Sequence, residues 1–249
     1  MSILLETKGL TKEFRGFVAV RSVDLAVERG AIHALIGPNG AGKTTVFNLL
    51  TKFLKPTAGR ILYDGRDVTS LAPASIARLG VVRSFQISAT FPQLTALENV
   101  RIALAAKAGG SFAFWRSDKT LERHNARALS LLEDVNLAEF ADTRAGELSY
   151  GRKRALEIAT TLALEPDLLL LDEPMAGMAH EEIGRIAALI KRIAVGRTVL
   201  MVEHNLGVVA DLCDKITVLR SGEILAEGDY ATVSKDPRVI EAYMGTGHA

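Results

Sequence analysis

The chain has 249 residues, with 30 basic and 29 acidic side chains, so its formal net charge at pH 7 is only +1. This balance argues against a general nucleic-acid-binding protein, which would need a surface excess of Lys and Arg. The length fits one α/β domain or two small ones. No apolar run approaches the roughly 18 residues that cross a bilayer, and we expect neither a membrane span nor a signal peptide. The single cysteine, Cys213, cannot form an intramolecular disulfide, which indicates a reducing cytoplasm and a buried, inert thiol.

The first 30 residues have the pattern of β-structure. Val23, Leu25 and Val27 alternate with polar or small residues, and a Glu-Arg-Gly turn at residues 28–30 leads into a short apolar strand at 31–36. Residues 37–44 then read Gly-Pro-Asn-Gly-Ala-Gly-Lys-Thr, which fits the phosphate-binding pattern G-x-x-x-x-G-K-[ST] at every fixed position. Residues 44–52 read as a helix, so the motif has the strand and helix context that it requires.

This loop has the chemistry of a nucleoside triphosphate site. Glycines let successive backbone N–H groups turn inward around phosphate oxygens, and the helix N-terminus adds unpaired donors and a positive dipole end. Lys43 can reach the β- and γ-phosphates, and the Thr44 hydroxyl can bind Mg²⁺. A glycine-rich turn with a solvated lysine is the alternative, and the strand and helix context argues against it. The predicted nucleotide-binding residues are Gly37, Pro38, Asn39, Gly40, Ala41, Gly42, Lys43, Thr44 and Thr45.

The rest of the chain predicts an α/β nucleotide core interrupted by a helical insertion. A strand at 60–63 ends in an Asp-Gly turn at 64–65, and residues 95–165 have a helical pattern. Apolar strands at 168–171 and 198–202 enclose a helix around 181–194, which predicts parallel strands buried on both faces. Strands at 215–219 and 223–226 form a hairpin around a Ser-Gly turn. In the helical part, one apolar face is expected to contain Leu121, Ala128, Leu132 and Val135.

Two carboxylates follow the apolar strand at 168–171. Asp172 at the strand end would hold Mg²⁺, through water, and Glu173 would act as general base toward the attacking water. The alternative is a buried strand that ends in a charged loop, and the phosphate-binding loop favours the catalytic interpretation.

Further polar positions are less specific by themselves. Gln86 could bind Mg²⁺ or orient water, although a lone glutamine is usually a surface residue. His204, after the strand at 198–202, could donate a hydrogen bond to the γ-phosphate, or it could be a strand-end histidine without a ligand. Ser149 and Gly151 look like an N-cap and a close-approach residue at a second helix N-terminus, where an ordinary cap is the alternative. The other histidines are interpreted as structural or surface residues: His33, His124, His180 and His248.

Taken in order, the phosphate loop, Gln86, the segment 148–152, the Asp-Glu pair at 172–173 and His204 resemble the ATP-binding-cassette family over essentially the whole chain. The resemblance implies an α/β fold: a RecA-like P-loop NTPase core with an N-terminal antiparallel β subdomain and an inserted helical subdomain. It implies a single domain over 4–246, with a core at about 4–88 and 162–246 and a helical subdomain at about 89–161.

The resemblance also implies an ATP- and Mg²⁺-dependent ATP hydrolase that works as a head-to-tail dimer. Ser149 and Gly151 of one subunit would cover the γ-phosphate bound by Lys43 of the other. Phe14 matches the aromatic residue that stacks on adenine, with Phe17 as the second candidate. The catalytic residues carried over are Glu173, His204, Gln86 and Lys43; the Mg²⁺ ligands are Thr44, Gln86 and Asp172.

Three positions depart from the family pattern. In the signature segment, Tyr150 stands where Gly is commonest and Arg152 where Gln is usual, although the phosphate-facing Ser149 and Gly151 are kept. Ala179 replaces the usual Asp or Asn in the loop after Glu173. This replacement calls into question whether the two sites of the dimer communicate normally.

Within the family, the chain is most similar to ATPase subunits of branched-chain or hydrophobic amino acid importers. Residues 37–48, 84–86, 98–100, 148–159 and 239–245 carry this similarity. It implies a peripheral protein on the cytoplasmic face of the membrane. The implied partners are permease subunits, an identical or a paralogous ATPase and, indirectly, a periplasmic or extracellular solute-binding protein; no nucleic acid is implied. A lipid or lipopolysaccharide exporter ATPase and a non-transport ATPase of the same fold are the alternatives.

One further segment, residues 109–116, is rich in aromatic residues and glycine. It either helps to dock the membrane subunits or packs its aromatic rings against the helical subdomain.

Overall fold

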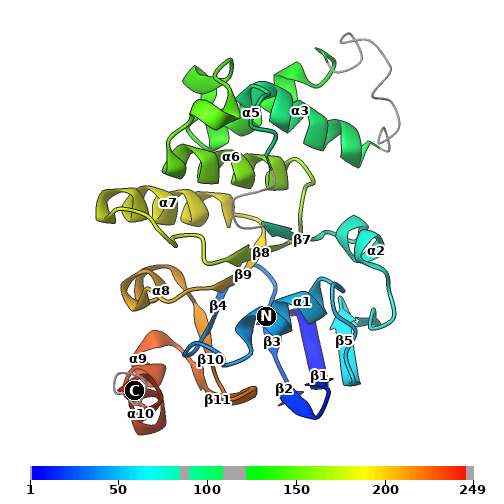
Figure 1. The fold of residues 1–249 in the computed structure, drawn as a ribbon, viewed down its shortest axis with the longest axis vertical. Helices are drawn as coiled ribbons and strands as arrows, with labels where there is room; N and C mark the ends of the chain where they lie inside the picture. The colour runs from blue at the N-terminus through cyan, green and yellow to red at the C-terminus, as the bar shows by residue number, and fades with distance from the viewer. Residues whose placement is uncertain (1, 85–89, 109–121, 245–249) are drawn as a thin grey trace. The chain divides into compact units, whose positions relative to one another are not determined.

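The computed structural model describes residues 2–84, 90–108 and 122–244, and it divides the chain into two compact units (Figure 1). The first unit comprises Met1–Val82, Asp167–Met175 and Ala194–Ala249. The second comprises Arg83–Pro166 and Ala176–Ile193. The predicted α/β class is confirmed, whereas the single domain over 4–246 and its subdomain limits stay predictions.

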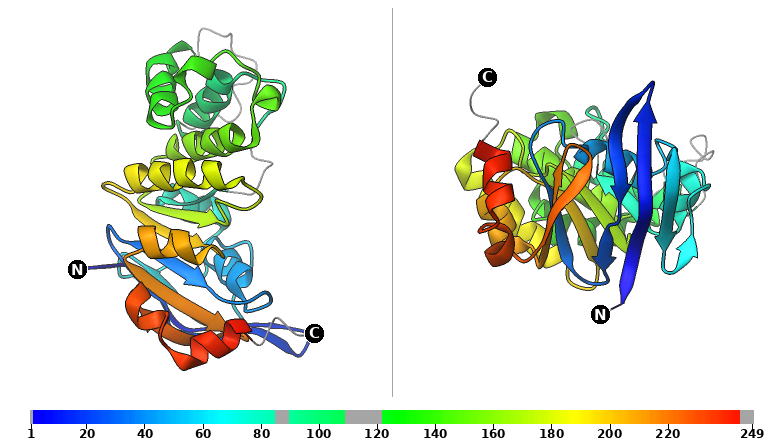
Figure 2. Two further views of the ribbon diagram at one scale, coloured as in Figure 1. Left: turned by 90° about the vertical axis from the view of Figure 1, so that its left-hand side faces the viewer. Right: turned by 90° about the horizontal axis from the view of Figure 1, so that it is seen from below.

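An antiparallel sheet forms from the N-terminal part of the chain. Its strands run side by side in the right-hand view of Figure 2, in the order β2-β1-β5-β6 with β3 also paired to β1. The side chains of Val23, Leu25 and Val27 are fully buried, as their alternation predicts. The strands are β1 (Ile3–Phe14), β2 (Phe17–Val23), β3 (Ala26–Glu28), β5 (Ala58–Tyr63) and β6 (Arg66–Asp67).

A second sheet, with strand order β11-β10-β4-β9-β8-β7, forms the nucleotide core. Its strands are β4 (Ile32–Ile36), β7 (Val81–Ser84), β8 (Leu168–Asp172), β9 (Thr198–Val202), β10 (Lys215–Arg220) and β11 (Glu223–Gly228). Strands β10, β4, β9 and β8 are parallel neighbours, and β11 closes the sheet as the antiparallel arm of the predicted hairpin. Every residue of β4, β8 and β9 is buried, because helices and loops cover both faces of a parallel sheet.

The helices of the first unit are short. They are α1 (Lys43–Leu50), α2 (Pro73–Arg78), α8 (Leu206–Leu212), α9 (Tyr230–Val233) and α10 (Pro237–Met244). Phe47 of α1 is the largest fully buried side chain of the described residues and packs in the core beneath the first sheet. Among these residues, no helix is both long and apolar enough to cross a membrane.

The second unit is helical, as residues 95–165 predict. Its elements are α3 (Ala96–Lys107), α5 (Asn125–Asp134), η1 (Ala138–Phe140), η2 (Ala145–Glu147), α6 (Tyr150–Leu162) and α7 (His180–Ile193). A capping box begins α3: the Thr95 hydroxyl accepts from the Glu98 N–H, and the Glu98 carboxylate accepts from the Thr95 N–H. Ala128, Leu132 and Val135 of the predicted apolar face are buried, whereas Leu121 lies outside the described residues.

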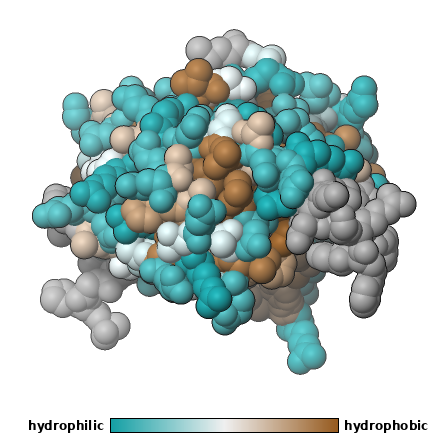
Figure 3. Space-filling view, turned by 90° about the horizontal axis from the view of Figure 1, so that it is seen from above, coloured by the Kyte–Doolittle hydropathy of each residue, from teal (hydrophilic) through white to brown (hydrophobic). Residues whose placement is uncertain are grey.

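The surface in Figure 3 is mainly hydrophilic, with several separate hydrophobic areas among the described residues. Isolated exposed apolar side chains such as Leu129, which is 38% exposed, are normal on a folded protein. Cys213 is only partly buried, so the prediction of a buried thiol is wrong. Burial still raises the pKa of Cys213 to about 12, with a further rise from the Asp214 and Glu203 carboxylates, so the group stays an unreactive thiol.

Two glycines at positive φ have different surroundings. Substituting each of them therefore distinguishes the cost of a steric clash from the cost of the backbone conformation. A Cβ at Gly59, with φ +87°, would lie 2.3 Å from the Gly9 carbonyl oxygen, whereas a Cβ at Gly65, with φ +74°, would contact nothing. We expect Gly65→Ala to lower the free energy of unfolding by about 1 kcal/mol and Gly59→Ala by about 3 kcal/mol or more. Urea unfolding midpoints with unchanged slopes measure both. Equal losses would show that strand contact adds no constraint at Gly59.

His33 in β4 is a structural residue, as expected, and the structure assigns its tautomer. Its side chain is fully buried, and Nε2 lies 2.8 Å from the Thr217 hydroxyl oxygen. The Thr217 hydroxyl donates its proton to Glu227 over 2.7 Å, so it accepts from Nε2–H of a neutral His33. Burial lowers the pKa of His33 from 6.5 to about 4, opposed by Glu227 and reinforced by Lys215.

This buried histidine should make the fold sensitive to mild acid. Since the unfolded chain binds a proton near pH 6.5 and the folded chain only near pH 4, folding stability falls as the pH drops through that window. The integrated loss is about 3 kcal/mol. Unfolding curves at pH 7 and pH 4.5 measure it, and His33→Gln, which cannot take up a proton, should lose this part of the acid sensitivity. An unchanged pH dependence in His33→Gln would contradict the assignment.

Candidate nucleotide-binding and catalytic site

The phosphate-binding loop connects β4 to α1, and neighbouring backbone fixes its shape. Gly37 and Gly42 have φ of +147° and +102°. A Cβ at Gly37 would lie 2.2 Å from the Leu219 carbonyl oxygen, and one at Gly42 would lie 2.6 Å from that of Ala19. Only glycine fits at either position, because both clashes are with backbone atoms. Gly42 is also the N-cap residue of α1, so the unpaired N–H groups of that helix begin where the loop ends.

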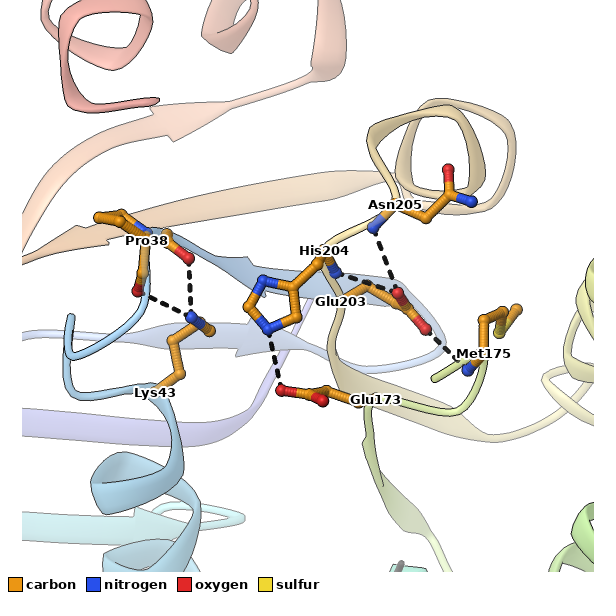
Figure 4. Close-up of polar contacts among 8 residues, drawn as sticks. Pro38, Lys43, Glu173, Met175, Glu203, His204 and Asn205 are labelled. Atoms are coloured by element: carbon orange, nitrogen blue, oxygen red, sulfur yellow. Dashed lines mark hydrogen bonds and ion pairs between the residues drawn. The ribbon is translucent and has the colours of Figure 1, made fainter. Parts of the chain in front are cut away.

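Lys43 is held over this loop. Its side chain is buried, and Nζ donates to the carbonyl oxygens of Gly37 at 2.7 Å and Pro38 at 3.0 Å (Figure 4). Burial lowers the pKa of Lys43, and the carboxylates of Glu173 and then Asp172 act in the opposite direction. The cation therefore lies near both carboxylates, in a fixed position from which it can meet phosphate oxygens.

Glu173 and His204 follow two adjacent parallel strands, β8 and β9, and meet directly. His204 Nε2 lies 2.8 Å from Glu173 Oε1, and since a carboxylate only accepts, the imidazole donates (Figure 4). Glu173 has φ +46°, in the left-handed region that non-glycine residues seldom adopt. Its N–H donates to the Val202 carbonyl over 2.9 Å, which ties this strained residue to the end of β9.

Oxygen donors suited to a hard cation lie at the same edge of the sheet. Asp172 is the buried last residue of β8 and pairs in register with Val202, while Thr44 is an exposed residue of the first turn of α1. Within residues 2–84, 90–108 and 122–244, no three His, Cys, Asp or Glu side chains cluster as a metal site. The oxygen donors of Thr44 and Asp172, completed by phosphate oxygens and water, are a set that fits Mg²⁺.

Two further predicted residues of the nucleotide site are Gln86 and Phe14. Gln86 lies outside the described residues. Phe14 ends β1 and pairs with Phe17 across a tight hairpin; the two rings are 41% and 67% exposed. Lys12 Nζ lies 5.0 Å from the centroid of the Phe14 ring, so the ring already has one cationic neighbour.

Ser149 and Gly151 belong to the second unit. Ser149 occupies the predicted N-cap position of α6, but its side chain makes no capping hydrogen bond. Gly151 faces Glu182 of α7: a Cβ there would lie 2.8 Å from the Glu182 Oε1 atom. Ser149 and Tyr150, at the start of α6, are both exposed in this unit.

The two departures in the signature segment each have a contact of their own. The Tyr150 hydroxyl donates to the Ala176 carbonyl over 2.9 Å, which ties the start of α6 to the loop that contains Ala179. The Arg152 guanidinium lies 3.9 Å from the centroid of the Phe140 ring, a cation–π contact. Both residues stabilise the segment around Ser149.

Glu203 is the site residue that sequence reasoning missed. Its side chain is 3% exposed, and its carboxylate accepts three backbone N–H groups, from Met175, His204 and Asn205 (Figure 4). The sequence did contain a signal for Glu203: it is an acidic residue between the apolar strand at 198–202 and His204, a position where a solvent-exposed charged side chain is not expected.

Comparisons with known proteins agree with this geometry. A family model described as ABC transporter matches residues 20–176, and one described as branched-chain amino acid ATP-binding cassette transporter matches residues 223–249. The high-affinity branched-chain amino acid transport ATP-binding protein BraF of Pseudomonas aeruginosa is 42% identical over 252 residues, covering 97% of this chain and 98% of BraF.

Solved structures share the fold. The ADP conformation of MJ1267, an ATP-binding cassette of an ABC transporter, has a TM-score of 0.87 at 31% identity, covering 98% of this chain and all of that one. The dimeric structure of MJ0796, a bacterial ABC transporter cassette, has a TM-score of 0.77 at 28% identity, covering 91% and 99%. The chain belongs to the ATP-binding-cassette transporter family. It is an ATP-binding and ATP-hydrolysing member, and the predicted cassette fold is confirmed.

Proposed function

We propose that this chain is the ATPase subunit of an importer that takes up branched-chain or other hydrophobic amino acids through separate membrane subunits. The main support for this substrate class is the 42% identity with BraF over nearly the whole of both chains. The match of residues 223–249 to the branched-chain amino acid cassette model supports the same class. In this role the protein is peripheral, on the cytoplasmic face of the membrane, and reaches a solute-binding protein only through the permease.

The site residues have the following roles. The loop of residues 37–45 binds the phosphates, with Lys43 at the β- and γ-phosphates. Glu173 accepts a proton from the attacking water. The His204 Nε2–H, which lies 2.8 Å from that carboxylate, orients Glu173 before ATP binds and would turn to the γ-phosphate in the ATP complex, because a neutral imidazole has a single N–H to donate. Phe14 stacks on adenine, and Gln86 contributes to the metal and water positions.

Mg²⁺ would be held by Thr44, Asp172 and Gln86, and it would neutralise the charge that develops on the phosphate oxygens. The residues of this chain do the remaining work: Lys43 adds a fixed positive charge, and the buried end of β8 keeps Asp172 and Glu173 beside it.

Two cassettes are proposed to act as a head-to-tail dimer, either of this chain twice or of this chain and a paralogue. Ser149 and Gly151 of one subunit would close over the γ-phosphate at Lys43 of the other. The exposed Ser149 and Tyr150 at the start of α6 support this role, since N–H groups at a helix N-terminus donate to anions. ATP binding would close the dimer, and hydrolysis would reopen it.

Uptake by cells tests the proposed substrate class. A strain that lacks this chain should lose accumulation of labelled leucine, the wild-type gene should restore it, and excess isoleucine or valine should compete. Uptake that is unaffected by the deletion, together with a defect in lipid or lipopolysaccharide export, would favour the exporter alternative. Failure of the chain to co-purify with any membrane subunit would favour a non-transport ATPase.

A further inference from the structure

A buried carboxylate that no assigned role uses lies directly behind the Glu173–His204 pair. Glu203, the residue after β9, is 3% exposed. Its Oε1 accepts the Met175 N–H at 2.9 Å, and its Oε2 accepts the N–H groups of His204 at 3.0 Å and Asn205 at 3.3 Å. One carboxylate therefore bridges the segment after β8 and the segment after β9 (Figure 4).

These two segments carry the two catalytic side chains. Met175 is two residues beyond Glu173, and His204 directly follows Glu203. Because Glu173 sits at φ +46°, its conformation depends on contacts made by the residues around it. The bond from the Glu173 N–H to the Val202 carbonyl fixes one side of that residue, and the bond from Met175 to Glu203 fixes the other.

The acceptor must be a carboxylate rather than an amide. The backbone N–H groups of Met175, His204 and Asn205 use both side-chain oxygens of Glu203 as acceptors. In Glu203→Gln, one oxygen becomes an NH₂ group that points at a backbone N–H. Either the Met175 side or the His204 side of the bridge would then lose its acceptor, although the size of the side chain stays the same.

We propose that Glu203 is a positioning residue that holds Glu173 and His204 at their hydrogen-bonding distance by bracing both backbone segments with one carboxylate. Glu203 touches neither nucleotide nor water in this role; it acts through the two residues that do. The inference rests on the proposed roles of Glu173 and His204.

The test is ATP hydrolysis by the chain co-purified with its membrane subunits, as wild type, Glu203→Gln, His204→Ala and the double variant. We expect Glu203→Gln to lower kcat by about 10- to 100-fold, with KM for ATP within about twofold of wild type, because the phosphate loop is untouched. In the His204→Ala background the same change should cost much less, since the Glu173–His204 hydrogen bond whose length Glu203 maintains is already absent.

Asn205→Ala is the matched control. The Asn205 side chain caps α8 by accepting from the N–H groups of Gly207 and Val208, while its backbone N–H still reaches Glu203. It should lower thermal stability with kcat close to wild type. If Glu203→Gln does not fold, Glu203→Asp serves as the second variant: it keeps the charge but is too short to span both segments, and it should lower kcat by a smaller factor.

The possible results distinguish failure of the positioning role from failure of the proposed catalytic site. The positioning role alone is overturned if Glu203→Gln lowers kcat by the same factor with and without His204. It is also overturned if Glu203→Gln leaves kcat unchanged while Glu173→Gln is inactive. A fully active Glu173→Gln overturns both that role and the proposed site. A kcat loss that depends on His204, with ATP affinity preserved, supports the inference.

Discussion

Replacing Glu173 by Gln is expected to lower the rate of ATP hydrolysis by about 10²- to 10⁴-fold while ATP binding stays near wild type. The amide keeps the shape of the side chain and can still contact His204, but it cannot accept a proton from water. The surrounding geometry supports a selective loss of the chemical step, because Glu173 follows β8, whereas the phosphate loop that provides affinity follows β4. Trapping of an ATP-dependent dimer would accompany the loss if the chain can pair with itself.

The measurement is phosphate release under saturating Mg-ATP, beside the binding of a fluorescent ATP analogue. Glu223→Gln is the matched control, because it makes the same chemical change on a surface carboxylate that is 58% exposed and pairs with Arg21. It should hydrolyse ATP at the wild-type rate. Retention of more than about a tenth of wild-type activity by Glu173→Gln would exclude it as the general base.

Replacing Lys43 by Ala should remove ATP binding, with affinity lower by about 100-fold or more. The ammonium is held by the Gly37 and Pro38 carbonyl oxygens, at 2.7 Å and 3.0 Å, so it is preorganised where phosphate charge must be balanced. Lys43→Arg should fail as well, because a planar guanidinium does not fit the buried position of a compact ammonium.

Equilibrium binding of ATP by titration calorimetry measures this loss, with circular dichroism to verify folding. Lys8→Ala is the control: Lys8 is 59% exposed and forms a surface ion pair with Glu6, so its removal should leave affinity unchanged. If Lys43→Ala bound ATP as tightly as wild type, the phosphates would have to lie elsewhere.

Much of the fold could be predicted because its periodic patterns are strong. The apolar runs at 168–171 and 198–202 are β8 and β9 because parallel strands covered on both faces need uninterrupted apolar side chains. The Asp64-Gly65 turn was predictable as well, since both residues adopt positive φ in a two-residue hairpin. A fixed motif then located Lys43 and Thr44 at the start of α1.

Other features depend on tertiary contacts that no local pattern encodes. Glu203 resembles any charged residue at a strand end until the fold brings Met175 to it from 28 positions away. Ser149 was correctly predicted at the N-cap position, but whether its hydroxyl caps the helix depends on side-chain rotation, and here it does not. Tyr150 and Arg152 looked like departures from a pattern, while their partners Ala176 and Phe140 lie on separate segments.

Whether ATP hydrolysis by this chain drives amino acid uptake is tested by leucine accumulation in proteoliposomes that contain the purified transporter, with ATP on the side of the membrane where this chain lies. We predict that wild-type vesicles accumulate labelled leucine while ATP is hydrolysed, and that Glu173→Gln vesicles bind ATP but accumulate none. Equal accumulation by the two would contradict the claim that hydrolysis at Glu173 drives uptake. Hydrolysis by wild type without any leucine accumulation would contradict the proposed substrate class and leave the ATPase assignment intact.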